Sequence, residues 1–332
     1  MSSENLEVVE PSAQQFAGRS FTQTAKRLFH ATRPKFFPAS VFSVLIGTAW
    51  GVQATGGFSA TVFTLALLAT VCVHAASNVL NDVGDDSGGT DRQNKDRIYP
   101  YTGGSQFIQK GIMSAPEMAR LGISLLTVAA IAGLLLIILK GTMVLYFGLV
   151  GVALAVFYSL GPARLSSLGI GETAVAVGFG VVPVAGAAWL QGATLDSTLL
   201  IVSLPASIWV AMILMANEVP DIAADGATGK RTLPVRLGLT ATAIIYVTMH
   251  SAAAAAIGWL TYTGALPLLA PLLPAALLML AFRSGIAIKK GVEDRNRMTR
   301  AIEGTLAIHT AGSLWLCACI LYMHWWPVTQ IQ

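Results

Sequence analysis

The chain has 332 residues, of which 54% are hydrophobic and only 11% are charged, and its mean hydropathy is +0.65. Soluble domains are about 45–50% apolar and about 25% charged, so this chain has too few polar residues to cover a soluble surface. The composition excludes an ordinary soluble globular domain and indicates an integral membrane protein, with the lipid bilayer as its main partner. We expect no nucleic-acid partner.

The N-terminal segment differs from the rest of the chain. Residues 1–22 are mostly polar, include Glu4, Glu7 and Glu10, and lack the apolar stretch of a signal peptide. We expect this segment to be a disordered tail. Residues 23–326 are expected to form a single transmembrane domain.

Nine apolar runs follow, each close to the ~20 residues that cross a bilayer as a helix. They are Phe37–Ala54, Phe58–Leu80, Pro116–Leu139, Thr142–Leu160, Glu172–Leu190, Ser197–Ala216, Thr240–Tyr262, Leu266–Ile288 and Ala301–Met323. Only helices and closed barrels satisfy backbone polar groups in lipid, and runs this continuous predict helices. The 32 glycines indicate close helix–helix contacts rather than broken helices. The predicted fold is an all-α bundle with nine transmembrane helices.

Charge predicts the orientation of these spans. Of the 21 Lys and Arg residues, Lys140 alone falls on the side opposite the N-terminus. Cytoplasmic loops carry an excess of Lys and Arg, which predicts a cytoplasmic N-terminus, with the loops after spans 2, 4, 6 and 8 on the same side. We therefore expect a multi-pass protein of the cell (inner) membrane.

The acidic residues follow the same distribution, because Asp196 alone lies on the far side. Ion-coupled transporters usually carry charged groups near the middle of the membrane, whereas the interiors of these spans hold no Asp, Glu, Lys or Arg. This pattern favours a catalyst at the cytoplasmic rim over a transporter.

The first acidic cluster follows span 2. Asn78 and Asp82 are four residues apart, as are Asn81 and Asp85, and residues four apart share one face of a helix. Asp91 follows two glycines, and we expect it to reach the same site from a loop. These oxygen donors suit Mg²⁺, which takes one or two carboxylates together with water and phosphate oxygens.

A second cluster repeats this spacing after span 6, at Asn217, Asp221 and Asp225. The two clusters end spans 2 and 6, and Asp82 and Asp221 are 139 residues apart, which indicates a weak internal repeat. We predict that they face each other and hold Mg²⁺ against a diphosphate. No Cys/His set has the spacing of a zinc site.

Carboxylates alone repel a diphosphate, so nearby cations are also required. Arg binds phosphate oxygens with two hydrogen bonds and Lys acts as a point charge. We predict phosphate contacts for Arg33, Lys230 and Arg231. Lys110 is open to the same role or to contact with lipid headgroups.

Other polar residues carry weaker signals. The segment from Gly226 to Arg231 resembles a P-loop but has two residues between its glycines where four are needed. His74, His250 and His309 lie within predicted spans and are interpreted as helix-contact residues rather than catalysts.

Both acidic clusters resemble the aspartate-rich motifs of UbiA-type intramembrane prenyltransferases. The first matches the pattern NxxNDxxDxxxxxD at Asn78, Asn81, Asp82, Asp85 and Asp91. The second matches NxxxDxxxD at Asn217, Asp221 and Asp225, followed by GKRTLPVRLG over residues 229–238. The segments TGGS at 102–105 and YSLGP at 158–162 also match. The resemblance implies a nine-helix bundle with an active-site cavity on its cytoplasmic side.

The resemblance also implies an activity, namely transfer of a polyprenyl group from a polyprenyl diphosphate to an aromatic acceptor. The spacer before Asp91 and the GKRTLPVRLG segment are most similar to the 1,4-dihydroxy-2-naphthoate prenyltransferases of menaquinone biosynthesis. The implied metal ligands are Asp82, Asp85, Asp91, Asp221 and Asp225. The implied diphosphate-binding residues are Asn78, Asn81, Asn217, Arg33, Lys230, Arg231 and Lys110. Tyr158 is expected either to stabilise the allylic end of the donor or to be an interfacial aromatic anchor.

Three alternatives remain open at this point. The acceptor could be 4-hydroxybenzoate, homogentisate, a haem or chlorophyll precursor, or a lipid. The acids could serve a divalent-cation or phosphate transporter. A CDP-alcohol phosphotransferase ranks lower because it needs a DGxxAR-type run, and Asp225-Gly226 continues as Ala-Thr-Gly.

Overall fold

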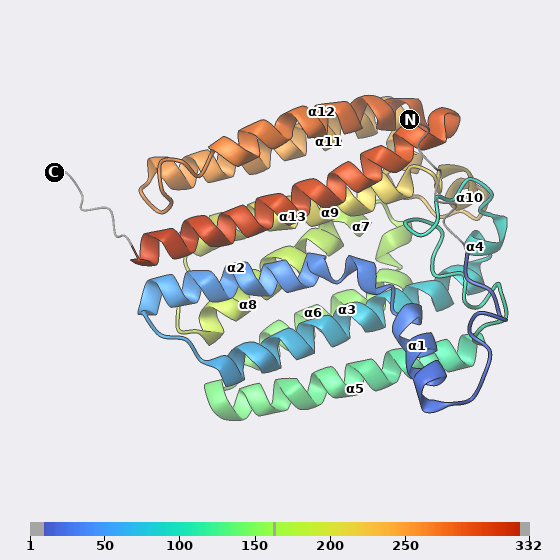
Figure 1. Cartoon of the computed structure of the whole chain (residues 1–332), viewed down its shortest axis with the longest axis horizontal. Helices are drawn as coiled ribbons and strands as arrows, with labels where there is room; N and C mark the ends of the chain where they lie inside the picture. The colour runs from blue at the N-terminus through green and yellow to red at the C-terminus, as the bar shows by residue number, and fades with distance from the viewer. Residues whose placement is uncertain (1–9, 162–163, 326–332) are drawn as a thin grey trace.

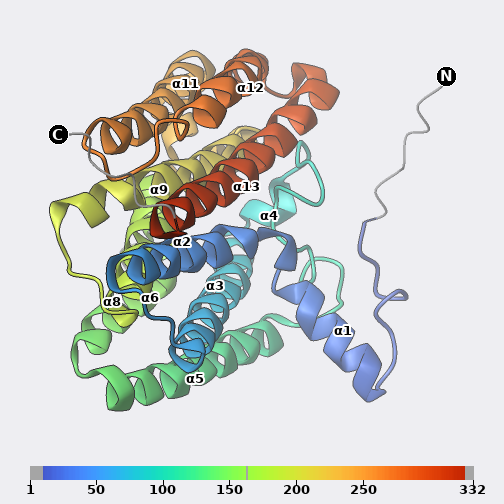
Figure 2. The same cartoon turned by 60° about the vertical axis from the view of Figure 1, so that its left-hand side comes forward.

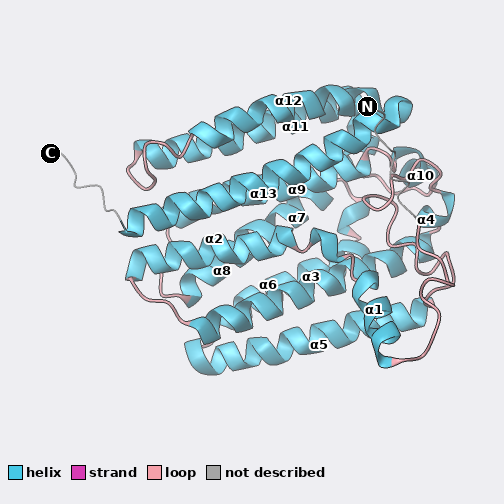
Figure 3. Ribbon diagram, in the orientation of Figure 1, coloured by secondary structure: helices cyan, strands magenta, loops and turns pink. Residues whose placement is uncertain are grey.

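The structure is a computed structural model that describes residues 10–161 and 164–325. Every regular element within these ranges is helical, as the apolar runs predict, and no strand occurs among the described residues (Figure 3). The long helices lie side by side with roughly parallel axes (Figure 1). The all-α fold is therefore confirmed.

The described part of the first half of the chain forms four longer helices and two shorter ones. Its elements are α1 (Phe21–Ala31), the 3-10 turn η1 (Pro34–Phe36), α2 (Pro38–Thr55), α3 (Ala60–Gly88), α4 (Thr90–Gln93), α5 (Ala115–Lys140), α6 (Met143–Ser159) and the 3-10 turn η2 (Leu165–Ser167). Helices α3 and α5 pack along much of their length.

The second half completes the bundle. Its elements are α7 (Gly171–Val175), the π-helical turn η3 (Ala176–Val181), α8 (Val182–Leu190), α9 (Ser197–Glu218), α10 (Ile222–Ala227), α11 (Leu233–Tyr262), α12 (Leu272–Lys290), the 3-10 turn η4 (Gly291–Asp294) and α13 (Arg295–Trp325). The largest buried cluster of apolar side chains joins α9 to α11, α12 and α13.

Seven segments in the described part of the chain are long and apolar enough to cross a membrane. One of them, Leu272–Trp325, contains both α12 and α13, which run in opposite directions (Figure 1). Helix α6 is apolar but shorter. The chain is thus a multi-pass membrane protein.

One predicted span is not a single regular helix. The run Glu172–Leu190 is divided into α7, the π-helical turn η3 and α8. Gly180 in this turn lies against Ser207 of α9 so closely that a Cβ at Gly180 would be 2.3 Å from the Ser207 Cα atom. The run still forms one candidate membrane span, Gly171–Leu190, in which close contact with α9 is combined with a local change of helical pitch.

Elsewhere glycine allows the close packing that was predicted. A Cβ at Gly47 of α2 would lie 2.1 Å from the carbonyl oxygen of Val184 on α8. One turn further on, Gly51 faces Gln191, just after α8. Small residues spaced in this way let two membrane helices approach at backbone distance.

The short helices and the longest loops gather at one end of the bundle, here called the site end. Helices α4 and α10 and the connection between α4 and α5 lie there (Figures 1 and 2). Helix α3 continues to Gly88, about two turns beyond the predicted end of its span at Leu80. The first acidic cluster is therefore carried on helix rather than loop.

Residues 10–22 differ from the disordered tail that was expected. Phe16 is buried and stacks against Phe107, with ring centroids 5.0 Å apart. Glu10 forms ion pairs with Arg97 at 2.6 Å and with Lys110 at 3.1 Å. This segment packs on the loop at the site end, and residues 1–9 lie outside the described residues.

Candidate active site

The first cluster is held in place by the end of α3 and by the loop that follows α4. Asp82 is 2% exposed and accepts a hydrogen bond from the backbone N–H of Ser105 at 3.1 Å. Arg33, whose Nη1 atom is 3.9 Å from Asp82 Oδ1, supplies the nearest positive charge. Asp82 is thus buried between a guanidinium group and a backbone donor.

Asp85 lies one turn further along α3. Its carboxylate accepts a hydrogen bond from Asn81 Nδ2 at 3.1 Å, and the same amide group also donates to Ser159 Oγ at 3.0 Å. Asp91 lies on α4 after the turn at Gly88 and Gly89, and it is 6% exposed. Asp91 therefore reaches the site from the segment after α3, as the sequence predicts.

The second cluster approaches from the opposite side. Asp221 precedes α10 and accepts hydrogen bonds from Asn94 Nδ2 at 2.5 Å and from the backbone N–H of Gly103 at 3.3 Å. Asp225, on α10, is 1% exposed.

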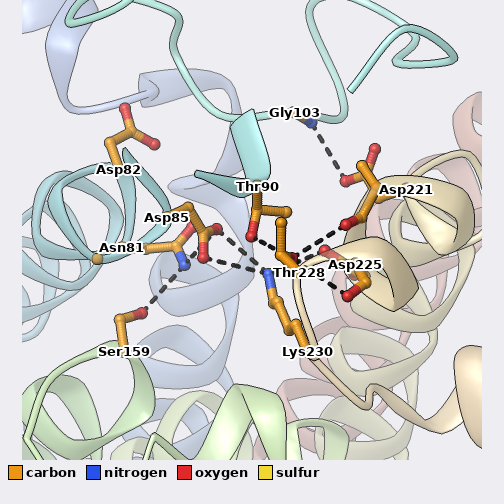
Figure 4. Close-up of polar contacts among 12 residues, drawn as sticks. Asn81, Asp82, Asp85, Thr90, Gly103, Ser159, Asp221, Asp225, Thr228 and Lys230 are labelled. Carbon is orange, nitrogen blue, oxygen red and sulfur yellow. Dashed lines mark hydrogen bonds and ion pairs between the residues drawn. The ribbon is translucent and has the colours of Figure 1, made fainter. Parts of the chain in front are cut away.

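Lys230 joins the two clusters. Its Nζ atom is 3.2 Å from Asp85 Oδ2 and 3.5 Å from Asp225 Oδ1 (Figure 4). A hydrogen bond of 2.9 Å between the hydroxyl groups of Thr90 and Thr228 links the same two regions. The predicted meeting of the two clusters is therefore present in the fold.

The acids at this end share a buried environment that opposes ionisation. Burial raises the pKa of Asp225 to about 7, although Lys230 acts in the opposite direction. Burial also raises the pKa of Asp91, reinforced by the charges of Asp82 and Asp85, and it raises the pKa of Asp221. Burial alone would lower the pKa of Lys230, but Asp85 and Asp225 raise it well above its ordinary value. A further cation at this site would favour the ionised carboxylates.

Several carboxylate oxygens have the properties of vacant metal ligands. Asp82 Oδ1, Asp91 Oδ2 and both oxygens of Asp225 are buried and accept no hydrogen bond from the described residues. A Cβ built on Gly104 would lie 2.6 Å from Asp91 Oδ2 and 3.0 Å from Asp82 Oδ1. Two unpaired oxygens thus converge on a space that only glycine leaves open.

Within the described ranges, no three His, Cys, Asp or Glu side chains are already gathered around one point. The buried donors without a hydrogen bond are carboxylate oxygens, and Mg²⁺ usually binds through one or two carboxylates and keeps water or substrate phosphate as its other ligands. The residues present therefore fit Mg²⁺ better than an ion enclosed entirely by protein ligands.

A cavity of about 110 Å³ lies beside the first cluster and extends toward the apolar interior. We call it the central cavity. Its polar wall includes Arg33, Asn78, Asn81, Tyr158 and Asn217. Its apolar wall comes from η1, α2, α7, η3 and α9 and includes Phe36, Phe179 and Ile213. The predicted asparagines and Tyr158 therefore share one cavity with Arg33.

Two predicted phosphate-binding residues are not brought to the clusters. Lys110 pairs with Glu10, and its side chain is 39% exposed. Arg231 is exposed and makes no ion pair with a described residue. Their contacts with a diphosphate stay predictions. Here the chain turns outward after Lys230, and the loop holding Lys110 packs on the N-terminal segment.

Sequence reasoning also missed donors that organise the site. Asn94, Gly103 and Ser105 donate to the acids, and they lie in a connection without regular structure. The TGGS segment was recognised, but no role was predicted for it. Its two consecutive glycines, both with φ of 69°, were the available signal for a backbone bent toward the acids.

Comparisons with known proteins agree with this geometry. Residues 40–302 match the UbiA prenyltransferase family. The chain is 31% identical to a 1,4-dihydroxy-2-naphthoate octaprenyltransferase from Haemophilus influenzae over 76% of this chain and 86% of that protein. It is 32% identical to the protein of the same name from Escherichia coli over 62% of this chain and 67% of that protein. It is also 28% identical to a 2-carboxy-1,4-naphthoquinone phytyltransferase from Synechocystis over 65% of this chain and 67% of that protein.

Solved structures show the same fold. A UbiA homolog from Aeropyrum pernix superposes with a TM-score of 0.63 at 19% identity, covering 85% of this chain and 96% of that one. A UbiA homolog from Archaeoglobus fulgidus, bound to DMAPP and Mg²⁺, superposes with a TM-score of 0.59 at 14% identity over 88% of this chain and 99% of that one. The family match covers most of the chain, and the paired acidic clusters lie where one bundle end closes over a cavity. The chain therefore belongs to the UbiA prenyltransferase family.

Proposed function

We propose that this protein transfers a polyprenyl group from a polyprenyl diphosphate to 1,4-dihydroxy-2-naphthoate, with Mg²⁺ as cofactor. The observation that carries the proposal is the pair of acidic clusters joined through Lys230, next to a cavity that leads into the apolar bundle. The choice of acceptor is supported by the two naphthoate prenyltransferases that are 31% and 32% identical to this chain.

The metal ligands would be Asp82, Asp85 and Asp91 from the first cluster and Asp221 and Asp225 from the second. Mg²⁺ held there would offset the charge of the diphosphate and stabilise it as a leaving group. The buried oxygens of Asp82, Asp91 and Asp225 that accept no hydrogen bond support this assignment. Without a cation, burial of so many carboxylates would be strongly unfavourable.

The protein's own cations and amides complete the diphosphate site. Arg33 and Lys230 are buried at its edges and can bind phosphate oxygens. Asn78, Asn81 and Asn217 line the adjoining cavity. The amide groups of Asn78 and Asn217 can donate to the same anion, whereas Asn81 would first have to give up its hydrogen bond to Asp85 or Ser159. For this contact Lys230 must exchange one carboxylate partner for a phosphate oxygen.

The remaining steps depend on the cavity walls. The allylic carbon–oxygen bond of the donor breaks, and its electron pair leaves with the diphosphate. A ring carbon of the acceptor forms the new carbon–carbon bond, and with the naphthoate the ring then loses its carboxylate as CO₂. The Tyr158 ring can stabilise the developing allylic charge through its face, and the apolar walls exclude water that would capture it.

We propose that the site end faces the cytoplasm of a bacterial-type inner membrane. Lys140 is the one basic residue predicted on the opposite side, and it ends α5 at the bundle end far from α4 and α10 (Figure 1). Soluble acceptors and Mg²⁺ would then reach the clusters from the cytoplasm, whereas the prenyl tail would enter from the bilayer.

The test is product analysis with purified protein in detergent or lipid. One polyprenyl diphosphate is offered with 1,4-dihydroxy-2-naphthoate or with 4-hydroxybenzoate, and the products are identified by mass spectrometry. The proposal expects a prenylated, decarboxylated product from the naphthoate that disappears with EDTA and returns with Mg²⁺. If product forms from 4-hydroxybenzoate alone, the naphthoate is not the acceptor. If product still forms in EDTA, the reaction does not depend on Mg²⁺. The Asp221→Ala variant is the inactive control.

A further inference from the structure

His74 is a polar residue at the deep end of the central cavity, and the proposed reaction has so far given it no role. It lies on α3 one helical turn before Asn78 and two turns before Asp82. At about 1.5 Å rise per residue, its Cα atom is roughly 12 Å from that of Asp82 along the helix. It is 4% exposed, and its ring lines the cavity.

Hydrogen bonds fix the state of the His74 ring. Its Nδ1 atom is 2.9 Å from Ser40 Oγ. A hydroxyl group carries one proton, and the Ser40 hydroxyl donates to the carbonyl oxygen of Phe37 at 3.1 Å. With the Ser40 proton on the Phe37 carbonyl oxygen, the ring proton lies on Nδ1 and Nε2 keeps a lone pair. The hydrogen bond between His74 and Ser40 is made at Nδ1 and leaves Nε2 for another partner.

Aromatic neighbours fix the orientation of the same ring. The centroid of His74 is 4.5 Å from that of Phe179 and 5.6 Å from that of Phe37. Phe179 belongs to the π-helical turn η3, and its carbonyl oxygen accepts a hydrogen bond from Ser43 Oγ at 2.6 Å. Such π-helical turns often occur at functional sites. The π-helical turn η3 thus places the flat apolar ring of Phe179 next to the hydrogen-bonding ring of His74.

A wall of this kind suits an aromatic alcohol better than a hydrocarbon chain. A lone pair left without a donor beside an isoprenoid tail would lose the hydrogen bond that it makes with water. A second cavity shares Ser77, Tyr158, Val175 and Phe179 with the central one, but it is not lined by His74 or by any charged residue. The polar group of His74 is therefore presented to the central cavity and not to the adjoining smaller one, whose volume is about 20 Å³.

We propose that His74 binds the ring hydroxyl of the aromatic acceptor, accepting its hydrogen bond at Nε2 while Phe179 stacks on the acceptor ring. This inference rests on the proposed prenyl transfer and names a residue for its second substrate. The hydrogen bond would orient the ring toward the allylic carbon and increase the electron density of the ring. No bond is formed or broken at His74 itself.

The test uses two substitutions that divide the histidine's functions. His74→Asn keeps a polar group near the Nδ1 position, so that Ser40 retains a partner, but it removes the group at Nε2. His74→Gln extends an amide oxygen toward the Nε2 position. His250→Gln is the matched control, because His250 is also buried in a predicted span but lies in a small separate cavity between α9, α11, α12 and α13.

The expected result is a difference between the two substrates. In His74→Asn, the acceptor KM should rise about tenfold or more, the scale expected for losing a buried hydrogen bond. The donor KM should change less than twofold, and His74→Gln should recover much of the acceptor affinity. Acceptor binding without donor, followed by the intrinsic fluorescence of the naphthoate, should weaken by the same factor.

Other outcomes would overturn the inference. A rise in donor KM with unchanged acceptor KM would assign His74 to the tail site. Equal losses in His74→Asn, His74→Gln and His250→Gln would show a packing role only. If the wild-type protein turns over neither acceptor, the proposed function itself fails, whereas normal wild-type turnover with unaffected His74 variants rejects His74 alone.

Discussion

Replacing Lys230 by Met tests whether this lysine occupies the position of a cation between the two acidic clusters. Its side chain is 15% exposed and pairs with Asp85, which is 17% exposed, and with Asp225, which is 1% exposed. Removing one partner of a buried ion pair costs about 3–5 kcal/mol. This value is an upper limit here, because a buried carboxyl group can take up a proton instead. We expect the thermal unfolding midpoint in EDTA to fall by at least about 5 °C.

The assay is thermal unfolding of the purified protein in detergent, with EDTA and with Mg²⁺. Mg²⁺ should stabilise the Lys230→Met variant more than the wild type, because an ion that binds the folded form stabilises it and the competing ammonium group is absent. The control is Lys95→Met, an exposed lysine at the same end of the bundle with no ion pair among the described residues. If both variants unfold within about 1 °C of each other in EDTA, or if Mg²⁺ stabilises both equally, the lysine does not balance these acids.

Three further predictions concern the same end of the bundle. Asp82→Asn should abolish prenyl transfer in membranes without lowering the amount of folded protein. The control Asp96→Asn, at a position outside the motif spacing, should retain activity. An active Asp82→Asn enzyme would exclude the Asp82 carboxylate from the mechanism. Gly104→Ala should lose most activity because its methyl group would lie 2.6 Å from a carboxylate oxygen. The control is Gly111→Ala, which has a similar φ of 65° but open space around the added methyl group and should only be destabilised by about 1–2 kcal/mol. Equal turnover by the two variants would count against a crowding effect at Gly104. Glu10→Gln should change stability by less than about 1 kcal/mol and only at low salt, because this residue is 41% exposed and exposed ion pairs are weak; a larger, salt-independent loss of stability would contradict that estimate.

Much of the fold was predictable because lipid restricts a membrane-spanning chain to backbone structures that satisfy their own hydrogen bonds. Each long apolar run had to be helical. The prediction that the spacing of four places Asn217, Asp221 and Asp225 on one side of a single helix was wrong, because α9 ends at Glu218 and Asp221 lies in the turn before α10. The distribution of basic residues along the chain predicted that both acidic clusters lie at the same end of the bundle. The structure confirms that they meet there, through Lys230.

The contacts of the loops were not predictable in the same way. Lys110 and Arg231 have the charge of phosphate ligands, but their direction depends on how irregular segments fold back. Lys110 turns toward Glu10, a residue assigned to a disordered tail. Backbone donors such as the N–H of Gly103 have no side-chain signature at all. The hydrogen bonds that hold the acids in place are therefore the part of the site that only three-dimensional structure reveals.

The histidines illustrate the same limit most clearly. His74, His250 and His309 each lie in an apolar run, so all three were interpreted alike as helix-contact residues. In the structure, both ring nitrogens of His250 are buried without a hydrogen-bond partner in the described part of the chain. The ring of His74 instead has one nitrogen bound by Ser40 and faces the central cavity. His74 differs from His250 because it is bound by Ser40, 34 positions away in the chain, and packs against the π-helical turn η3. The difference between the two histidines therefore arises from packing and not from local sequence.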